Sequence, residues 1–203
     1  MLPPFTLLSC IESDADGKTM PTETPGQEKG LHRIPKGFSL IELLIVVAII
    51  LVIAAIAIPN FLSSRMAANQ AAGAETVRTV STASVAYMDA WNNGYPPSLA
   101  TLGGVEPGPA TCNAALLIDP LVATPPNQKS GYVFNLSPQG PAVSNPPAGC
   151  VPGFTAYLMT ALPQSPNTGT VSYCSNEPGV IHFDSTGQPI PTPDACNNLP
   201  ALQ

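Results

Sequence analysis

The chain has 203 residues, enough for one globular domain together with an extended element. Only 10% of its residues are charged and its net charge is −6, which argues against the basic face that a nucleic-acid-binding protein needs. With 25 prolines and 16 glycines, the composition favours a loop-rich domain with short strands over an all-helical bundle.

The first segment, residues 1–30, is polar and rich in Pro, Glu, Thr and Gly, a composition typical of disorder. Leu7-Leu8-Ser9-Cys10 resembles a lipoprotein cleavage box, but it has no basic flank and follows too short an apolar stretch. Met20 is an alternative start that would remove Cys10.

A continuous apolar segment, FSLIELLIVVAIILVIAAIAI, follows at residues 38–58 and contains one charge, Glu42. A helix of this length spans about 31 Å, close to the roughly 30 Å hydrocarbon core of a bilayer. The alternative, a buried helix of a soluble protein, is seldom apolar on all faces for this length. We therefore expect one transmembrane helix. Basic residues precede it and none follows before Arg65, which predicts a cytoplasmic N-terminus and an external C-terminal domain.

The helical pattern continues beyond the span. Residues 61–91 are rich in Ala, which favours a helix. The stretch Gly94-Tyr95-Pro96-Pro97 then ends the helical pattern. Together these features predict one helix over residues 38–92. An apolar stripe at helical spacing would face the domain: Val77, Val80, Ser84, Met88 and Trp91. We expect Tyr87 and Trp91 to pack this helix against a sheet rather than to form a ligand platform.

The remainder of the chain predicts short strands between loops. Four candidates are rich in β-branched or aromatic residues: Tyr132–Leu136, Phe154–Met159, Val171–Cys174 and Val180–Phe183. The last two flank a hairpin-like turn at residues 175–179, while residues 103–128 and 137–152 read as connections. The expected fold class is α+β, with a small antiparallel sheet packed on the second half of the helix.

Four cysteines lie in the C-terminal part, and they allow three pairings into two disulfides. They are Cys112, Cys150, Cys174 and Cys196. A zinc site is disfavoured because the chain has no CxxC motif and only two histidines. Outside the cytoplasm, disulfides are the expected state.

The junction before the apolar segment, Lys36-Gly37-Phe38-Ser39-Leu40-Ile41-Glu42, resembles the signal sequence of type IV prepilins and of the related pseudopilins of type II secretion systems. The resemblance is close over residues 36–62, which include Ile58-Pro59-Asn60. A weaker match continues through Asn93–Pro96 and Leu99–Leu102. The resemblance implies a type IV pilin-like fold.

For processing, the resemblance implies that a membrane aspartyl peptidase cuts between Gly37 and Phe38 and methylates the new amine of Phe38. A glycine at the cut also lets a protease approach the backbone closely. The expected segments are a cleaved leader (1–37), the transmembrane and assembly helix (38–58), its amphipathic continuation (59–92) and a loop-rich β head (93–203).

Glu42 is the candidate assembly residue, because a carboxylate inside an apolar span is costly and marks a functional position. The resemblance implies that it pairs with the terminal amine of the next subunit. Pairing with its own terminus and simple snorkelling remain alternatives. Pro59 removes a backbone donor; the resemblance implies a kink or a locally melted segment in a filament, and the alternative is that it ends the membrane helix.

The resemblance also bears on the head. A disulfide between Cys174 and Cys196 would match the disulfide-bound region of many type IV pilins, and Cys112 would then pair with Cys150. Major pseudopilins hold calcium in the C-terminal region, which makes three acidic residues weak calcium candidates although no EF-hand spacing is present. They are Glu177, Asp184 and Asp194. No other metal or cofactor is expected.

The expected function is a structural subunit of a type IV pilus-like filament, with a type II secretion pseudopilin as the alternative. Expected partners are copies of this chain, other pilins or pseudopilins, the prepilin peptidase, an inner-membrane assembly platform and the membrane itself. We expect the chain in the bacterial inner membrane before assembly and in a surface pilus or periplasmic pseudopilus afterwards. A membrane-tethered enzyme or binding domain is a remote alternative. An enzyme is disfavoured because the head has one histidine, His182, and no GxSxG motif.

Overall fold

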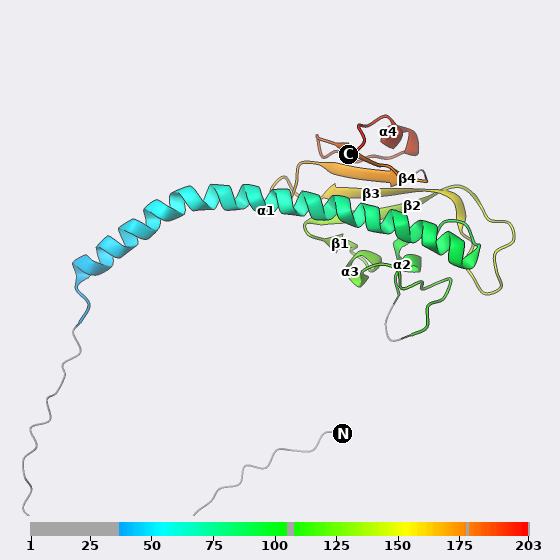
Figure 1. The fold of residues 1–203 in the computed structure, drawn as a ribbon, viewed down its shortest axis with the longest axis horizontal. Coiled ribbons are helices and arrows are strands. Elements are labelled where there is room, and N and C mark those ends of the chain that lie inside the picture. The colour runs from blue at the N-terminus through cyan, green and yellow to red at the C-terminus, as the bar shows by residue number, and fades with distance from the viewer. Residues whose placement is uncertain (1–36, 105–107, 178, 203) are drawn as a thin grey trace, which may run out of the picture. The chain divides into compact units, whose positions relative to one another are not determined.

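The computed structural model describes residues 37–104, 108–177 and 179–202. The leader expected at residues 1–37 lies, apart from Gly37, outside these residues. One long helix, α1 (Leu40–Trp91), is followed by a small sheet and three short helices (Figure 1). In chain order these are α2 (Leu99–Leu102), α3 (Pro120–Ala123), β1 (Gln128–Lys129), β2 (Tyr132–Ala142), β3 (Phe154–Pro163), β4 (Ser172–Asn176), β5 (Ile181–Asp184) and α4 (Pro193–Asn197).

Helix α1 is 52 residues long, which agrees with the helix expected over residues 38–92. Its first intrahelical bond runs from the Leu43 amide to the Ser39 carbonyl at 3.2 Å, and the helix passes through Pro59 without a break. It ends where Asn92 and Gly94 adopt positive φ values of 47° and 69°. Asn and Gly tolerate this left-handed region, so the sequence itself ends the helix.

The five strands form one antiparallel sheet in the sequential order β1-β2-β3-β4-β5. The second half of α1 lies across one face of this sheet (Figure 1), which confirms the expected α+β fold. Apolar side chains from the helix and the sheet meet in a shared core. Its largest fully buried members are Tyr87, Tyr132, Tyr157, Leu102, Met159, Val77 and Val80.

The buried stripe of α1 differs in part from the predicted one. Val77, Val80 and Ser84 are buried as expected, but Met88 and Trp91 are only half buried. Tyr87 takes the central place at 0% exposure. The buried stripe therefore ends at Tyr87, whose hydroxyl donates to the Cys112 carbonyl at 2.8 Å. The expectation that Tyr87 and Trp91 pack the helix against the sheet is confirmed for Tyr87, with Trp91 at the core margin.

Strands β2 and β3 extend well beyond their predicted ends, β4 is longer by one residue, and β1 was not predicted at all. β2 continues to Ala142, so the interpretation of residues 137–152 as a connection was wrong for their first part. Proline is tolerated there because Pro138 sits beyond the reach of β1, on an open edge where no ladder partner needs its missing N–H. The predicted hairpin of β4 and β5 is confirmed, with the Gly179 amide donating to the Asn176 carbonyl at 2.8 Å. Pro178 of that turn lies outside the described residues.

A second, smaller core covers another part of the sheet. It joins Leu158 of β3 and Cys174 of β4 to Ile190 and Cys196 of the C-terminal segment. Helix α4 is capped by Thr192, whose hydroxyl accepts a bond from the Ala195 amide at 3.2 Å. The C-terminal segment therefore packs onto the sheet as a part of the head.

Candidate assembly site

The junction residues precede α1 directly. Gly37, Phe38 and Ser39 stand before the first helical residue, and the Phe38 side chain is 74% exposed. Glu42 lies in the first turn of α1 and is exposed. The N-terminal end of a helix carries a partial positive charge, which favours a carboxylate in this turn. The arrangement places one acidic group a single turn from the position that cleavage would convert into a terminal amine.

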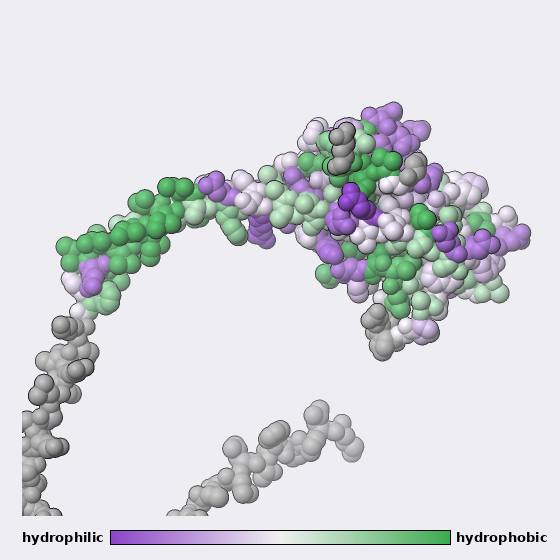
Figure 2. Space-filling view, viewed as in Figure 1, coloured by the Kyte–Doolittle hydropathy of each residue, from purple (hydrophilic) through white to green (hydrophobic). Residues whose placement is uncertain are grey.

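The apolar half of α1 exposes its large side chains throughout its length, and Figure 2 shows an apolar surface on the side that faces the viewer. Ile45, Ile50, Ile53 and Ile56 are exposed by 53%, 57%, 61% and 67%, respectively. Among the described residues, α1 is the one helix long and apolar enough to cross a membrane. Exposure of this much contiguous apolar surface to water is unfavourable. Lipid or other protein chains must therefore cover this half of the helix.

Polar side chains surround Pro59. Because proline has no amide hydrogen, the Ala55 carbonyl loses its normal helical donor. The side chains of Asn60, Ser63 and Ser64 each donate to the carbonyl four residues earlier, at 3.3, 3.1 and 2.9 Å. Such back-bonding satisfies polar groups next to an apolar span but weakens the helical ladder slightly. The lost donor at Pro59 therefore interrupts the backbone ladder of α1 at one carbonyl, that of Ala55.

A buried hydrogen-bond network ties the end of α1 to the loops of the head. The Tyr87 hydroxyl donates to the Cys112 carbonyl at 2.8 Å and accepts from the Asn93 side-chain amide at 3.1 Å. The same amide donates to the Val151 carbonyl at 2.8 Å. Asn93 is fully buried, so each of these bonds replaces a lost contact with water. In the sequence, Asn93 is marked only by its place in the stretch Asn93–Pro96, where the helix ends.

Next to this network, the backbone that follows α1 lies close to the backbone at the start of β3. The Tyr95 and Phe154 backbones exchange two hydrogen bonds of 2.8 and 2.9 Å. A Cβ atom at Gly153 would lie 1.9 Å from the Asn93 carbonyl oxygen, which no residue other than glycine could accommodate without movement. Gly153 therefore allows the strand after the loop to approach the end of the helix.

Both disulfides lie in the head. Cys112 is bonded to Cys150 and Cys174 to Cys196, with Cα–Cα distances of 5.6 and 6.0 Å. These are the pairs that the resemblance implied. Cys174 and Cys196 are completely buried in the smaller core, whereas the other pair is half buried in surface loops.

The three calcium candidates are not brought together. Within the described residues, no group of three or more His, Cys, Asp and Glu side chains could hold a metal ion. The Asp184 carboxylate instead accepts bonds from the Thr186 amide and hydroxyl at 2.9 and 2.8 Å. Asp194 lies in the first turn of α4, and Glu177 lies in the exposed turn after β4.

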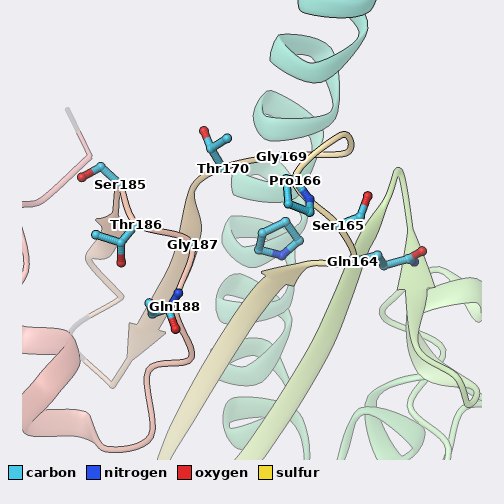
Figure 3. A pocket seen from close by; sticks show the side chains of 10 residues that line it. Gln164, Ser165, Pro166, Gly169, Thr170, Ser185, Thr186, Gly187 and Gln188 are labelled. Carbon is cyan, nitrogen blue, oxygen red and sulfur yellow. The ribbon is translucent and has the colours of Figure 1, made fainter.

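The head carries a shallow polar hollow of about 300 Å³ at one end of the sheet (Figure 3). Two loops form it, one after β3 and one after β5, and no charged side chain lines it. The residues labelled around it include Gln164, Ser165, Thr170, Ser185, Thr186 and Gln188. An uncharged lining supplies neither a general acid nor a general base, so the hollow offers no arrangement for catalysis.

Three buried hydroxyls lie between α1 and the sheet, and no local sequence pattern indicates them. Ser81 of α1, Tyr157 of β3 and Ser175 of β4 have hydroxyl oxygens without a well-formed hydrogen bond in the described part of the chain. Burial raises the pKa of the Tyr157 phenol above its usual value, and the two nearby serine hydroxyls act in the opposite direction. Such groups stabilise a fold only when they are paired.

Comparison with known proteins is informative for the N-terminal part alone. Residues 33–58 match the model of the prokaryotic N-terminal methylation motif. Over 37 residues, the chain is 62% identical to the type IV wide pilus major component PilA4 of Thermus thermophilus. That match covers 18% of this chain and 28% of the relative, so the chain covers less than a third of the relative's length. No solved structure matches the chain.

The matched segment contains the Gly37–Phe38 junction, Glu42 and the apolar half of α1 up to Ile58, which are the features that the geometry had already set apart. The N-terminal segment of this chain therefore carries the prokaryotic N-terminal methylation motif and is similar to the corresponding part of a type IV pilus component.

Proposed function

We propose that the chain is a structural subunit of a type IV pilus-like filament, processed before Phe38 and assembled through α1. The observation that carries the proposal is the exposed apolar half of α1, headed by a single carboxylate in its first turn. Two surroundings suit such a helix. Before assembly it would span the inner membrane with the head outside, and afterwards the helices of neighbouring copies would bury it.

In this proposal, Glu42 directs assembly. The prepilin peptidase would release Phe38 and methylate its amine, and the Glu42 carboxylate would pair with the amine of a neighbouring copy. In a medium of low polarity an unpaired carboxylate is costly, whereas a charge pair with hydrogen bonds is tolerated. The charge pair would therefore favour one arrangement of neighbouring copies. An inner-membrane assembly platform would supply subunits to the growing filament.

The test is the substitution Glu42→Ala in a strain that makes the filament. We expect normal cleavage at Gly37–Phe38 and loss of sheared surface filaments in electron microscopy. Glu75→Ala is the matched control, because Glu75 is an exposed acid on the same helix that pairs with Arg78 at 3.1 Å. Mass spectrometry of N-methylated Phe38 reports the processing step. Normal filament yield from Glu42→Ala would contradict the proposed role of this carboxylate.

A pseudopilin of a type II secretion system is the second candidate. It is favoured by the stretch Asn93–Pro96 and Leu99–Leu102, which resembles the close of the long helix in such subunits. Deletion of the gene separates the two candidates: a pilin deletion removes surface filaments, and a pseudopilin deletion leaves exported proteins in the periplasm. In both cases we propose a mechanical role rather than an enzymatic one.

A further inference from the structure

Strand β2 is an edge strand for most of its length. β1 pairs only with Tyr132 and Val133, and the Phe134 amide donates to the Asn127 carbonyl at 2.9 Å just before β1. The backbone groups of Phe134 therefore point to the β1 side. Because these groups alternate between the two sides of a strand, those of Leu136 and Pro138 point to the same side. No further strand of the described chain faces them there.

The space beside this open edge is only partly filled. A hollow of about 190 Å³ lies next to Leu136, between β2 and the segments that carry α2 and α3. An open edge of a sheet is a template on which a strand of another chain can pair. β2 is long enough for such pairing, since it has 11 residues.

The sequence of β2 interrupts the row of donors on this side. Pro138 has no N–H, and its nitrogen points away from β3, so the ladder to β3 loses no bond. Beyond it the register shifts between Gln139 and Ala142, with Gly140 at a φ of 70°. Such a bulge bends the strand and ends regular pairing.

The opposite edge of the sheet is protected in a different way. The Phe183 amide of β5 donates to the Pro200 carbonyl at 3.1 Å, and the Leu202 amide donates to the Ile181 carbonyl at 2.7 Å. The C-terminal segment thus covers β5 with its own backbone. The β5 edge is therefore covered by the C-terminal segment, whereas the β2 edge carries a proline and a bulge.

We propose that Pro138, together with the bulge at Gly140 and Pro141, prevents the β2 edge of one copy from pairing with the β2 edge of a second copy. Two identical edges can meet about a two-fold axis, so the chain is its own most available partner. Without the proline, each copy would offer one more donor on the open side. The protection would operate wherever copies are crowded, and it does not depend on the proposed function.

The test compares two variants of the full chain in detergent micelles. Pro138→Ser restores an N–H on the open side without adding apolar surface. Gln139→Ser is the matched control, because its nitrogen points to β3 and the open edge stays unchanged. We expect Pro138→Ser to self-associate at a concentration lower by about tenfold, since a two-fold pairing gains one hydrogen bond from each copy. Sedimentation over a concentration series measures this midpoint.

Hydrogen exchange locates the contact. In Pro138→Ser, amides of residues 134–142 should exchange more slowly at high protein concentration than at low concentration, and those of the control should not. Pro138→Val provides a second variant, whose higher strand propensity should give stronger association with the same protected residues. An unchanged midpoint in both Pro138 variants would overturn the proposal. So would association that leaves exchange of residues 134–142 unaffected, or an equal shift in Gln139→Ser.

Discussion

The two halves of α1 belong to one continuous helix but differ in what surrounds them. From Leu44 to Leu62 the large apolar side chains are exposed, whereas from Gly73 to Tyr87 a single narrow stripe is buried against the sheet. The first half has no partner within the described residues, and the second half has one in the sheet.

The composition of the two halves follows this difference. The first half uses Ile, Leu and Val on every face, which suits lipid or other helices on all sides. The second half buries one large side chain, Tyr87, on a stripe otherwise made of Gly, Ala, Ser, Thr and Val. A Cβ atom at Gly73 would lie 3.2 Å from the Tyr132 ring. Hydrophobicity in a helix therefore reports the final surroundings of the helix rather than its burial in a single chain. The same charge should have different consequences in each half.

The largest effect is expected from a charge in the buried stripe. Val80 is 1% exposed, so Val80→Asp places an unpaired carboxylate in the core and should lower the free energy of unfolding by about 3–5 kcal/mol. Chemical denaturation followed by tyrosine and tryptophan fluorescence measures this loss. Val85→Asp is the control, because Val85 is 38% exposed on the same helix and its change should be small. Similar losses in both variants would contradict the assignment of the stripe.

A charge in the apolar half should act on the membrane and not on the head. Ile50→Asp should make insertion less favourable by about 3 kcal/mol, which is seen as a smaller membrane-bound fraction after carbonate extraction. Unfolding of the head should match that of wild type. Ile50→Leu is the control for both readouts. If Ile50→Asp destabilised the head as Val80→Asp does, the two halves would not be independent.

A smaller effect is expected where the helix meets the loops of the head. Tyr87→Phe removes the hydroxyl that bonds to Cys112 and Asn93, leaving buried groups unpaired at a cost of about 1–3 kcal/mol. A double-mutant cycle with Asn93→Ala measures how strongly the two side chains are coupled. Additive losses in that cycle would argue against a shared network.

The smallest effect concerns the ion pair between Asp119 and Lys129, whose charged atoms are 2.9 Å apart. The hydrogen bond from Lys129, and then that from the Leu121 amide, lowers the pKa of Asp119. The resulting stability is present above the unfolded pKa of about 3.9 and is lost as the pH falls through the lowered value.

Both side chains of this pair are partly exposed, so the contribution should be below about 1 kcal/mol. The difference in unfolding free energy between wild type and Asp119→Asn, measured across this acid range, checks the prediction. A wild-type advantage that grew as the pH fell would contradict the sign.

The sequence predicts elements best where one physical requirement dominates. Residues 38–58 can only be a helix if they meet a bilayer, and Asn92 with Gly94 gives the helix a definite end. The β-branched and aromatic runs likewise indicated four of the five strands. The N-terminal junction was recognisable because its residues act locally, within one turn.

The remaining features depend on contacts between distant residues. Residues 137–152 were interpreted as a connection, although an edge position makes Pro138 acceptable in a strand. The place of Tyr87 in the core depends on a carbonyl 25 residues away, and the Ser81, Tyr157 and Ser175 hydroxyls come from three elements. No local sequence pattern indicates which of these distant residues come into contact.

The two disulfides differ in chemical accessibility. The bond between Cys174 and Cys196 is shielded on all sides, whereas the one between Cys112 and Cys150 is within reach of small thiols in solution. Mild reductant should therefore open the second bond while the first persists. A purified preparation could then be heterogeneous in its thiol content while keeping the same sheet, and thiol labelling would detect the loosened loop before spectroscopy did.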